Sequence, residues 1–351
     1  MPALTTEIQL RTSPHAHSGR SVTTIMANVV LATLPICAYS VWLFGISALA
    51  SIVTACAFCL IAEHLFCRLS KRPTSVGDFS VVITGILLAL TLPPGFPLWM
   101  TAVGSFVAVG LGKMLFGGLG FNVFNPALVG RAFLQAAFPA AITSYTPPLA
   151  ANRFAEFIPT SLTLPFMQPP AITEWIERVR IDAFSGATPL MLQKFEHART
   201  ELLPLFLGQV SGSAGETSAI VILLCGLYLI ARKFMDWRIP AAMLASAFLF
   251  SAAFYLFDAA QYPHPLTTLF SGGLMLGAIF MASDMVASPV TPLGVWIYGA
   301  LMGALTVLIR LKGGLPEGVM YAILLGNAVS PLIDNLTQPR IYGARRKAAR
   351  A

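Results

Sequence analysis

The sequence predicts an all-α polytopic membrane protein with about ten transmembrane helices, some of them broken, in two inverted five-helix repeats. Of its 351 residues, 56% are hydrophobic and 11% are charged, whereas about a quarter of the residues in a soluble domain are charged. The mean hydropathy is +0.75, and apolar stretches of nearly membrane-spanning length recur along the chain. This composition excludes an ordinary soluble enzyme and a disordered chain.

The first half of the chain begins with a polar segment, residues 1–24. The apolar stretch that follows has full membrane length and no small-residue cleavage pattern, so we expect this segment to be cytoplasmic and uncleaved. Residues 25–138 form the first five-helix half. Its predicted spans are 25–44, 46–67, 79–92, 98–116 and 123–138.

The second five-helix half is residues 204–337, and residues 338–351 form a basic cytoplasmic tail. The predicted spans of this half are 217–231, 239–257, 266–282, 293–309 and 318–333. An odd number of spans in each half makes the second half enter the membrane from the opposite face, which predicts an inverted repeat.

Weak internal likeness supports the repeat. Residues 84–88, before Pro93-Pro94, are similar to residues 272–276, before Ser288-Pro289. The segment 125–130 is likewise similar to 326–331. Helices broken at corresponding positions of two halves indicate a site near the membrane midplane, so the third and eighth spans are the candidates.

The net charge of +7 is explained by membrane orientation rather than by nucleic-acid binding. With the N-terminal segment inside, the basic residues near Arg68, Lys113 and Arg232 and those of the tail are cytoplasmic. Only Arg310 and Lys312 lie in short outer connections. The tail is expected to contact lipid headgroups. The five cysteines lie in apolar stretches, which favours reduced packing residues over disulfides or iron–sulfur ligands.

The connection at residues 139–203 mixes basic and acidic side chains and is therefore expected to lie outside the membrane, on the extracytoplasmic side. Two short amphipathic helices are predicted, over 171–181 and 191–203. Between them Pro189 favours an extended conformation of Thr188, which predicts that the threonine is displayed. By spacing alone, an ordinary Ser-Gly turn remains an alternative explanation of this segment.

The segment Asp182-x-x-Ser185-Gly186-Ala187-Thr188 resembles the flavinylation motif shared by the D subunit of Rnf electron-transport complexes and the B subunit of sodium-pumping NADH:quinone oxidoreductases. In those relatives a flavin transferase esterifies the phosphate of FMN to the hydroxyl of the motif threonine. The resemblance therefore implies covalent FMN on Thr188 and a flavin transferase as maturation partner. From the residues alone, Asp182 is equally explained as a local cap or salt-bridge partner.

The resemblance covers nearly the whole chain, including residues 125–131 and 212–218. It implies a fold similar to urea transporters in a bacterial inner membrane, a periplasmic Thr188, cytoplasmic termini and a riboflavin near the cytoplasmic half. Rnf complexes move electrons between NADH and ferredoxin while carrying Na⁺ or H⁺ across the membrane. The short N-terminal segment favours the Rnf subunit. The quinone reductase subunit and a non-redox solute channel of similar fold are the alternatives.

The sequence contains no P-loop, no dinucleotide-binding GxGxxG pattern and no zinc-ligand spacing. NADH must therefore be oxidised by other subunits, and the resemblance implies iron–sulfur and flavoprotein subunits as partners. We expect a subunit of a translocase that is not itself catalytic on NADH and holds no metal.

A small-residue turn opens the sixth predicted span and is a candidate flavin contact. Free N–H groups and the positive end of a helix favour negative charge there. A helix cap followed by close packing explains the pattern equally well. In that case Glu216 only interacts favourably with the helix dipole. The candidate residues are Gly212, Ser213, Gly215, Glu216 and Thr217.

A possible ion or flavin path is assigned to Asp284, Asn125 and Arg131. For Asp284 and Arg131 the reason is that ionisable groups within a membrane are costly and therefore candidates for function. Asp284 follows a broken span, where backbone carbonyls can help to hold a cation, and a capping role is the alternative. Arg131 is expected to pair with a carbonyl or carboxylate, or to contact a flavin. Glu63 and His64 lie beside a basic loop, so both side chains are expected to snorkel.

Overall fold

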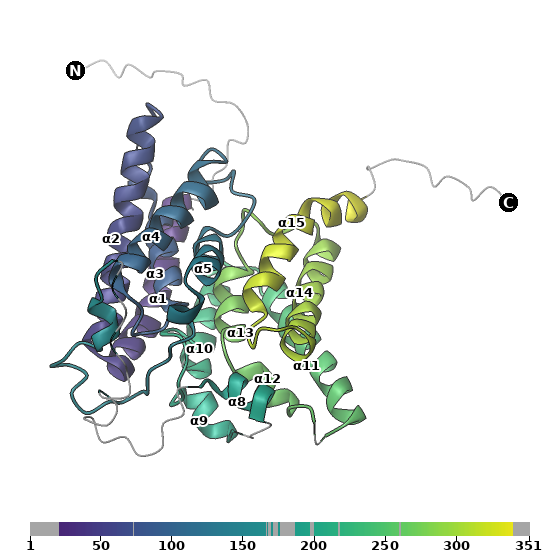
Figure 1. Ribbon diagram of the computed structural model, residues 1–351. Helices are drawn as coiled ribbons and strands as arrows, with labels where there is room; N and C mark the ends of the chain where they lie inside the picture. Colours follow the sequence, from purple (N-terminus) through teal and green to yellow (C-terminus); the bar gives the residue numbers. More distant parts are fainter. Residues whose placement is uncertain are drawn as a thin grey trace, which may run out of the picture.

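Two groups of helices lie side by side in the molecule (Figure 1), one from each half of the chain. The first group, purple to blue, runs from α1 to α5, and the second, green to yellow, from α10 to α15. The short helices α8, α9 and α12 lie together at the lower end of the view. No strand occurs in the part of the chain that the structure describes. The computed structural model describes residues 21–72, 74–165, 167, 170, 175, 187–196, 200–216, 218–259 and 261–339.

The first group contains two long helices followed by shorter ones. Ser21 caps the first helix, because its hydroxyl accepts a hydrogen bond from the Thr24 amide at 3.1 Å. The fourth helix continues directly into a π-helical segment, η2. The elements are α1 (Val22–Phe44), α2 (Ile46–Leu69), η1 (Val76–Asp78), α3 (Ser80–Leu90), α4 (Leu98–Val109), η2 (Gly110–Met114), α5 (Pro126–Ala137) and α6 (Pro139–Ile142).

The second group repeats this mixture of long and interrupted helices. A second π-helical segment, η4, follows the three-residue helix α13. The elements are η3 (Pro159–Leu162), α8 (Pro189–Glu196), α9 (Leu202–Leu207), α10 (Ala219–Ala231), α11 (Arg238–Phe257), α12 (Pro265–Phe270), α13 (Leu274–Leu276), η4 (Gly277–Met281), α14 (Pro292–Lys312) and α15 (Val319–Thr337).

In the part of the chain that the structure describes, five helices are long and apolar enough to cross a membrane, namely α1, α2, α11, α14 and α15. Three shorter apolar helices accompany them. Helix ends fall within a few residues of the predicted span ends, because the apolar runs that would cross lipid are also the helical runs. The eighth predicted span is broken between α12 and α13, where Gly272 has a φ of +62°.

The prediction of one helix over 191–203 is wrong. α8 already begins at Pro189 and ends at Glu196, and α9 follows from Leu202. Proline is favoured in the first turn of a helix, where its missing N–H costs no hydrogen bond, so it begins this helix. The helix predicted over 171–181 lies largely outside the described residues.

The core lies where the short helical elements α3, α13 and η4 meet the long helices. Leu88 and Leu90 of α3 and Leu274 of α13 are fully buried. The two halves contact each other through α1 with α10 and through α5 with α15. Large apolar side chains on the outer helices are exposed, as expected of residues that face lipid, for example Leu31 and Leu249.

Close approach of the long helices depends on small residues. A Cβ atom on Gly303 of α14 would lie 2.2 Å from the Met243 carbonyl oxygen of α11, so glycine is required for this contact. Small residues at helix contacts are the usual packing device in membranes.

Candidate functional site

Thr188 lies immediately before α8, and its hydroxyl caps that helix. The Met191 amide donates to Thr188 Oγ1 at 3.3 Å. Thr188 stays outside the helix, but only 6% of the residue is exposed. The prediction that it is displayed is therefore wrong. Pro189 begins a helix, and that helix packs against the protein.

The residue before the motif threonine is hydrogen-bonded to the segment that leads into the small-residue turn before α10. Ser211 Oγ donates to the Ala187 carbonyl oxygen at 2.7 Å, which brings the turn predicted from the sequence next to the end of the motif. The other predicted residues of the motif, Asp182, Ser185 and Gly186, lie outside the described residues, as does Thr217.

The small-residue turn binds the break after α3. The Ala214 amide donates to the Leu92 carbonyl oxygen at 2.9 Å, and the Gly215 amide donates to the Leu90 carbonyl oxygen at 2.7 Å. Ser213 beside them is fully buried. The turn thus joins the two halves of the chain, in addition to preceding a helix.

Arg131 of α5 contacts two carboxylates. Its Nη1 lies 3.4 Å from Glu216 Oε1, and its Nη2 donates to Glu317 Oε2. The expectation that Arg131 pairs with a carbonyl or a carboxylate is confirmed, and both partners are carboxylates. The alternative in which Glu216 interacts only with a helix dipole does not hold, because this side chain is 4% exposed and bonded to Arg131. Glu317 was not identified from the sequence. The only indication of it was that a buried arginine needs a partner, which does not say where in the chain that partner lies.

A second buried arginine, Arg310, lies in the last turn of α14. Its Nη1 donates to the Thr268 carbonyl oxygen at 2.7 Å, and its Nη2 donates to the Ser271 carbonyl oxygen at 3.0 Å. The sequence placed Arg310 in an exposed connection, which is wrong, because it is 5% exposed and within the helix.

Arg310 lines a cavity of about 130 Å³ beside α8, here called the Arg310 pocket. Lys194 of α8 also lines it and donates to the carbonyl oxygens of Gly313 and Leu315, at 2.5 and 2.8 Å. Partial burial lowers the pKa of the Lys194 ammonium. The lining residues are Leu190, Gln193, Lys194, Gln261, Tyr262, Pro263, Thr268, Val307, Arg310, Leu311 and Pro316.

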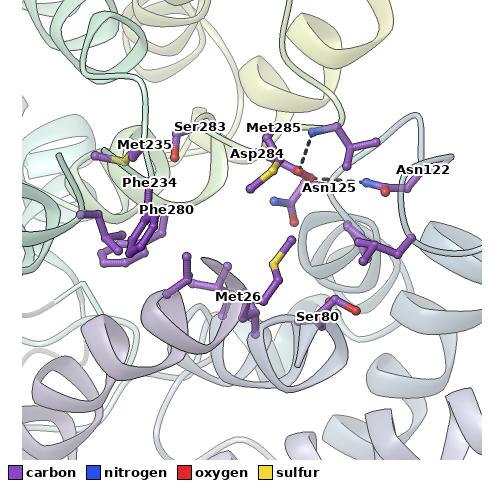
Figure 2. Close-up of a pocket in the computed structure, with 18 of the residues that line it drawn as sticks. Met26, Ser80, Asn122, Asn125, Phe234, Met235, Phe280, Ser283, Asp284 and Met285 are labelled. Atoms are coloured by element: carbon purple, nitrogen blue, oxygen red, sulfur yellow. Dashed lines mark hydrogen bonds between the residues drawn. The ribbon is translucent and has the colours of Figure 1, made fainter. Parts of the chain in front are cut away.

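A different cavity, of about 100 Å³, lies between the two halves and is here called the Asp284 pocket (Figure 2). Polar side chains converge on one part of it, and the Phe234 and Phe280 rings lie on another. The lining residues are Met26, Val29, Ser80, Ile83, Thr84, Leu87, Lys113, Leu119, Asn122, Asn125, Pro126, Leu229, Phe234, Met235, Ile279, Phe280, Ser283, Asp284, Met285 and Val286.

Asp284 and Asn125, both predicted site residues, line this same pocket. The Asp284 carboxylate accepts from Asn122 Nδ2 at 3.4 Å and from the Val286 amide at 3.1 Å. Asn125 caps α5 through its Oδ1 and donates to the Met281 carbonyl oxygen at 3.4 Å. Arg131 does not line this pocket, and Asn122 was not identified from the sequence.

Lys113 lines the Asp284 pocket as half of a buried ion pair. Its Nζ lies 2.9 Å from Glu63 Oε1 and 2.7 Å from Ser80 Oγ. Glu63 is fully buried, so the prediction that it snorkels is wrong. The reason is tertiary, because α4 and its continuation η2 place a cation opposite the carboxylate, whereas the neighbouring His64 is exposed as expected.

The cysteines agree with a packing role. All five are free thiols, and Cys59 is fully buried. No group of three or more histidine, cysteine or acidic side chains that could hold a metal occurs among the described residues.

Comparison with known proteins shows the family of the chain. Residues 9–343 match the NQR2, RnfD, RnfE family. The chain is 39% identical over 347 residues to the D subunit of the proton-translocating ferredoxin:NAD(+) oxidoreductase complex of Clostridium ljungdahlii, and the match covers 96% of both chains.

Two further relatives match from end to end. Identity is 39% over 346 residues to the D subunit of the ion-translocating oxidoreductase complex of Actinobacillus succinogenes, and the match covers 95% of this chain and 98% of the relative. Identity is 38% over 340 residues to the D subunit of the Na(+)-translocating ferredoxin:NAD(+) oxidoreductase complex of Acetobacterium woodii, and the match covers 96% of this chain and 95% of that one.

Proposed function

The chain belongs to the NQR2, RnfD, RnfE family, and from this premise we propose that it is the D-type membrane subunit of an ion-translocating ferredoxin:NAD oxidoreductase complex. The observation that carries the proposal is end-to-end similarity to three D subunits, at 38% to 39% identity. The subunit relays electrons through a covalent FMN on Thr188 and a riboflavin in the Asp284 pocket. The relatives carry different ions, protons in one and sodium in another.

The proposed architecture is two inverted repeats of five helices, similar to urea transporters, in a bacterial inner membrane. The helix order supports it, because each half has two helices, then a short or interrupted one, then two more. Basic residues at the ends of α2 and α10 support cytoplasmic termini and a periplasmic Thr188.

Thr188 is the proposed attachment point of FMN. A flavin transferase forms the bond between Thr188 Oγ1 and phosphorus, the phosphoanhydride of a flavin dinucleotide donor breaks, a nucleoside monophosphate leaves and the hydroxyl proton is released. Because Thr188 is 6% exposed, attachment requires α8 to be released from its packed position or to fold after attachment.

The Asp284 pocket fits riboflavin. Asn122 and Asn125 offer amide donors and acceptors for the polar edge of a flavin ring, and the Phe234 and Phe280 rings offer an apolar wall. The Asp284 carboxylate disfavours a phosphate, and the Lys113 cation is paired with Glu63. An uncharged flavin without phosphate therefore suits this pocket better than FMN. The bound flavin supplies one- and two-electron chemistry, and the residues set its position and surroundings.

Ion transport is proposed to be coupled to this relay. Moving one charge against 100 mV costs about 2.3 kcal/mol, so an open pore would dissipate the stored energy. Asp284, Asn125 and Arg131 remain the proposed residues of the ion or flavin path. Asp284 and Asn125 line one pocket, and Arg131 lies with Glu216 and Glu317 beyond it. Iron–sulfur and flavoprotein partner subunits, rather than this chain, react with ferredoxin and NADH.

The decisive experiment is mass spectrometry of the Thr188 peptide from cells that express a flavin transferase. The peptide should be heavier by one FMN moiety, and the denatured protein should fluoresce in a gel. Thr188→Ala should abolish both signals, whereas Thr163→Ala, in the same long connection, should leave them unchanged. An unmodified wild-type peptide would refute covalent FMN and would favour a solute channel of this fold.

A further inference from the structure

The Arg310 pocket begins at the attachment point. Leu190 lies two residues after Thr188 and lines this pocket. Its side chain also packs closely against Gly272, where a Cβ atom would lie 2.5 Å from Leu190 Cδ1 and 3.2 Å from Arg310 Nη2. A glycine at this position therefore lets α8 and the guanidinium meet. A flavin joined to Thr188 by a phosphoribityl chain has the cavity within its reach.

The charge of Arg310 faces no bonded carboxylate among the described residues. Two carbonyl oxygens fix the guanidinium in place without cancelling its charge. The nearby carboxylates, Glu216 and Glu317, are bonded to Arg131 instead. Arg310 Nε has no hydrogen-bond partner in the described part of the chain. Glu317 still attracts Arg310 at longer range, so its charge is offset only in part. A fixed, buried cation without a direct counter-charge favours an anionic ligand.

The lining of the Arg310 pocket suits a flavin ring. Tyr262, Val307 and Leu311 supply apolar or aromatic surface, and Gln193 and Gln261 supply amide groups for the ring edge. Its charged residues are Lys194 and Arg310, both cationic, and no acidic residue is found among the described lining residues.

The neighbouring cavity on the other side of Pro316 is less suitable. It has a volume of about 30 Å³, and Glu317 lines it together with Arg131. A negative charge there would meet a carboxylate, and the space is smaller than that of the Arg310 pocket.

We propose that the flavin ring tethered to Thr188 binds in the Arg310 pocket, and that Arg310 is the positioning residue whose cation stabilises the reduced ring. The inference rests on the proposed attachment of FMN. A neutral oxidised ring that takes two electrons from the preceding carrier of the complex and one proton becomes a monoanion. The guanidinium then offsets one negative charge, which favours reduction.

The test uses the intact complex, purified from cells that express the transferase, and measures the midpoint potential of the covalent flavin. Arg310→Gln should weaken stabilisation of the reduced ring about tenfold, which lowers the potential by about 30 mV for a two-electron couple. Arg310→Lys should restore most of this loss. Lys233→Gln removes an exposed cation just after α10 that does not line this pocket, and it should change nothing.

Separate outcomes identify which proposal fails. An unmodified Thr188 peptide in the wild type refutes the attachment itself. A modified peptide with the same potential in wild type and Arg310→Gln refutes the Arg310 pocket. If the Arg310→Gln protein does not accumulate, the test is the quenching by iodide of the fluorescence of the flavin in the wild-type protein. A flavin as accessible to iodide as in denatured protein overturns the proposal, and a protected flavin whose potential falls in Lys194→Gln supports it.

Discussion

The Asp284 pocket and the Arg310 pocket each contain a buried cation near the end of a helix, and they differ in what that cation contacts. Lys113 in η2 reaches Ser80 at the start of α3, and Arg310 in α14 reaches Ser271 just before α13. Lys113 is paired with Glu63, whereas Arg310 is held only by carbonyl oxygens.

This difference teaches that similar placement of a cation can serve opposite purposes. The paired Lys113 adds no net charge to its pocket, where Asp284 is the remaining charge. Arg310 and Lys194 make the other pocket cationic. The charge difference supports the proposal above, in which an uncharged riboflavin occupies the first pocket and an anionic reduced FMN ring the second.

The largest expected effect concerns the side of the membrane on which each region of the protein lies. In a variant that lacks the five native cysteines, Glu201→Cys beside α9 should react with an impermeant maleimide in intact cells. Arg232→Cys at the end of α10 should react only after the membrane is opened. Both positions are exposed, so the difference reports the membrane side. Equal labelling of the two positions would contradict the proposed orientation.

The next largest effect is expected from Glu63→Gln, which leaves the buried Lys113 unpaired. Removing one partner of a buried pair costs about 3–5 kcal/mol, so the aggregation temperature of the detergent-purified protein should fall by several degrees. Replacing both Glu63 and Lys113 by methionine should recover most of this loss.

The matched control is Asp236→Asn, which removes an exposed pair to Arg238 at 3.8 Å and should cost less than about 1 kcal/mol. A Glu63→Gln protein as stable as this control would show that Lys113 needs no counter-charge, and the contrast with Arg310 would disappear.

A smaller effect is expected from Asn122→Ala. The substitution removes a side-chain donor to Asp284, and a hydrogen bond contributes about 1 kcal/mol. The amount of non-covalent flavin retained by the purified complex should therefore fall about fivefold. Covalent flavin on Thr188 should remain, since the two pockets are separate. Asn152→Ala, at an exposed loop position, serves as the control. Equal losses of both flavins would mean that the pockets are not independent.

Sequence analysis succeeded where the controlling interactions are local. The apolar runs located the long helices, because a helix satisfies its own backbone hydrogen bonds wherever side chains face lipid. It also identified Asn125 and Asp284, since a cap before a proline and an acid after a broken helix are visible in the chain. It anticipated a carboxylate for Arg131 but named neither Glu216 nor Glu317 as its partner.

The amino-acid sequence by itself determined a multi-pass helical membrane protein and the family it belongs to, through composition, apolar periodicity and similarity along nearly the whole chain. Only the tertiary structure decided that Glu63 is buried against Lys113, that Thr188 is buried and that Arg310 lines a cavity beside α8. These are contacts between residues far apart in the chain, or between a helix and the surface on which it packs. Local propensities carry no information about which distant charge will compensate a buried one.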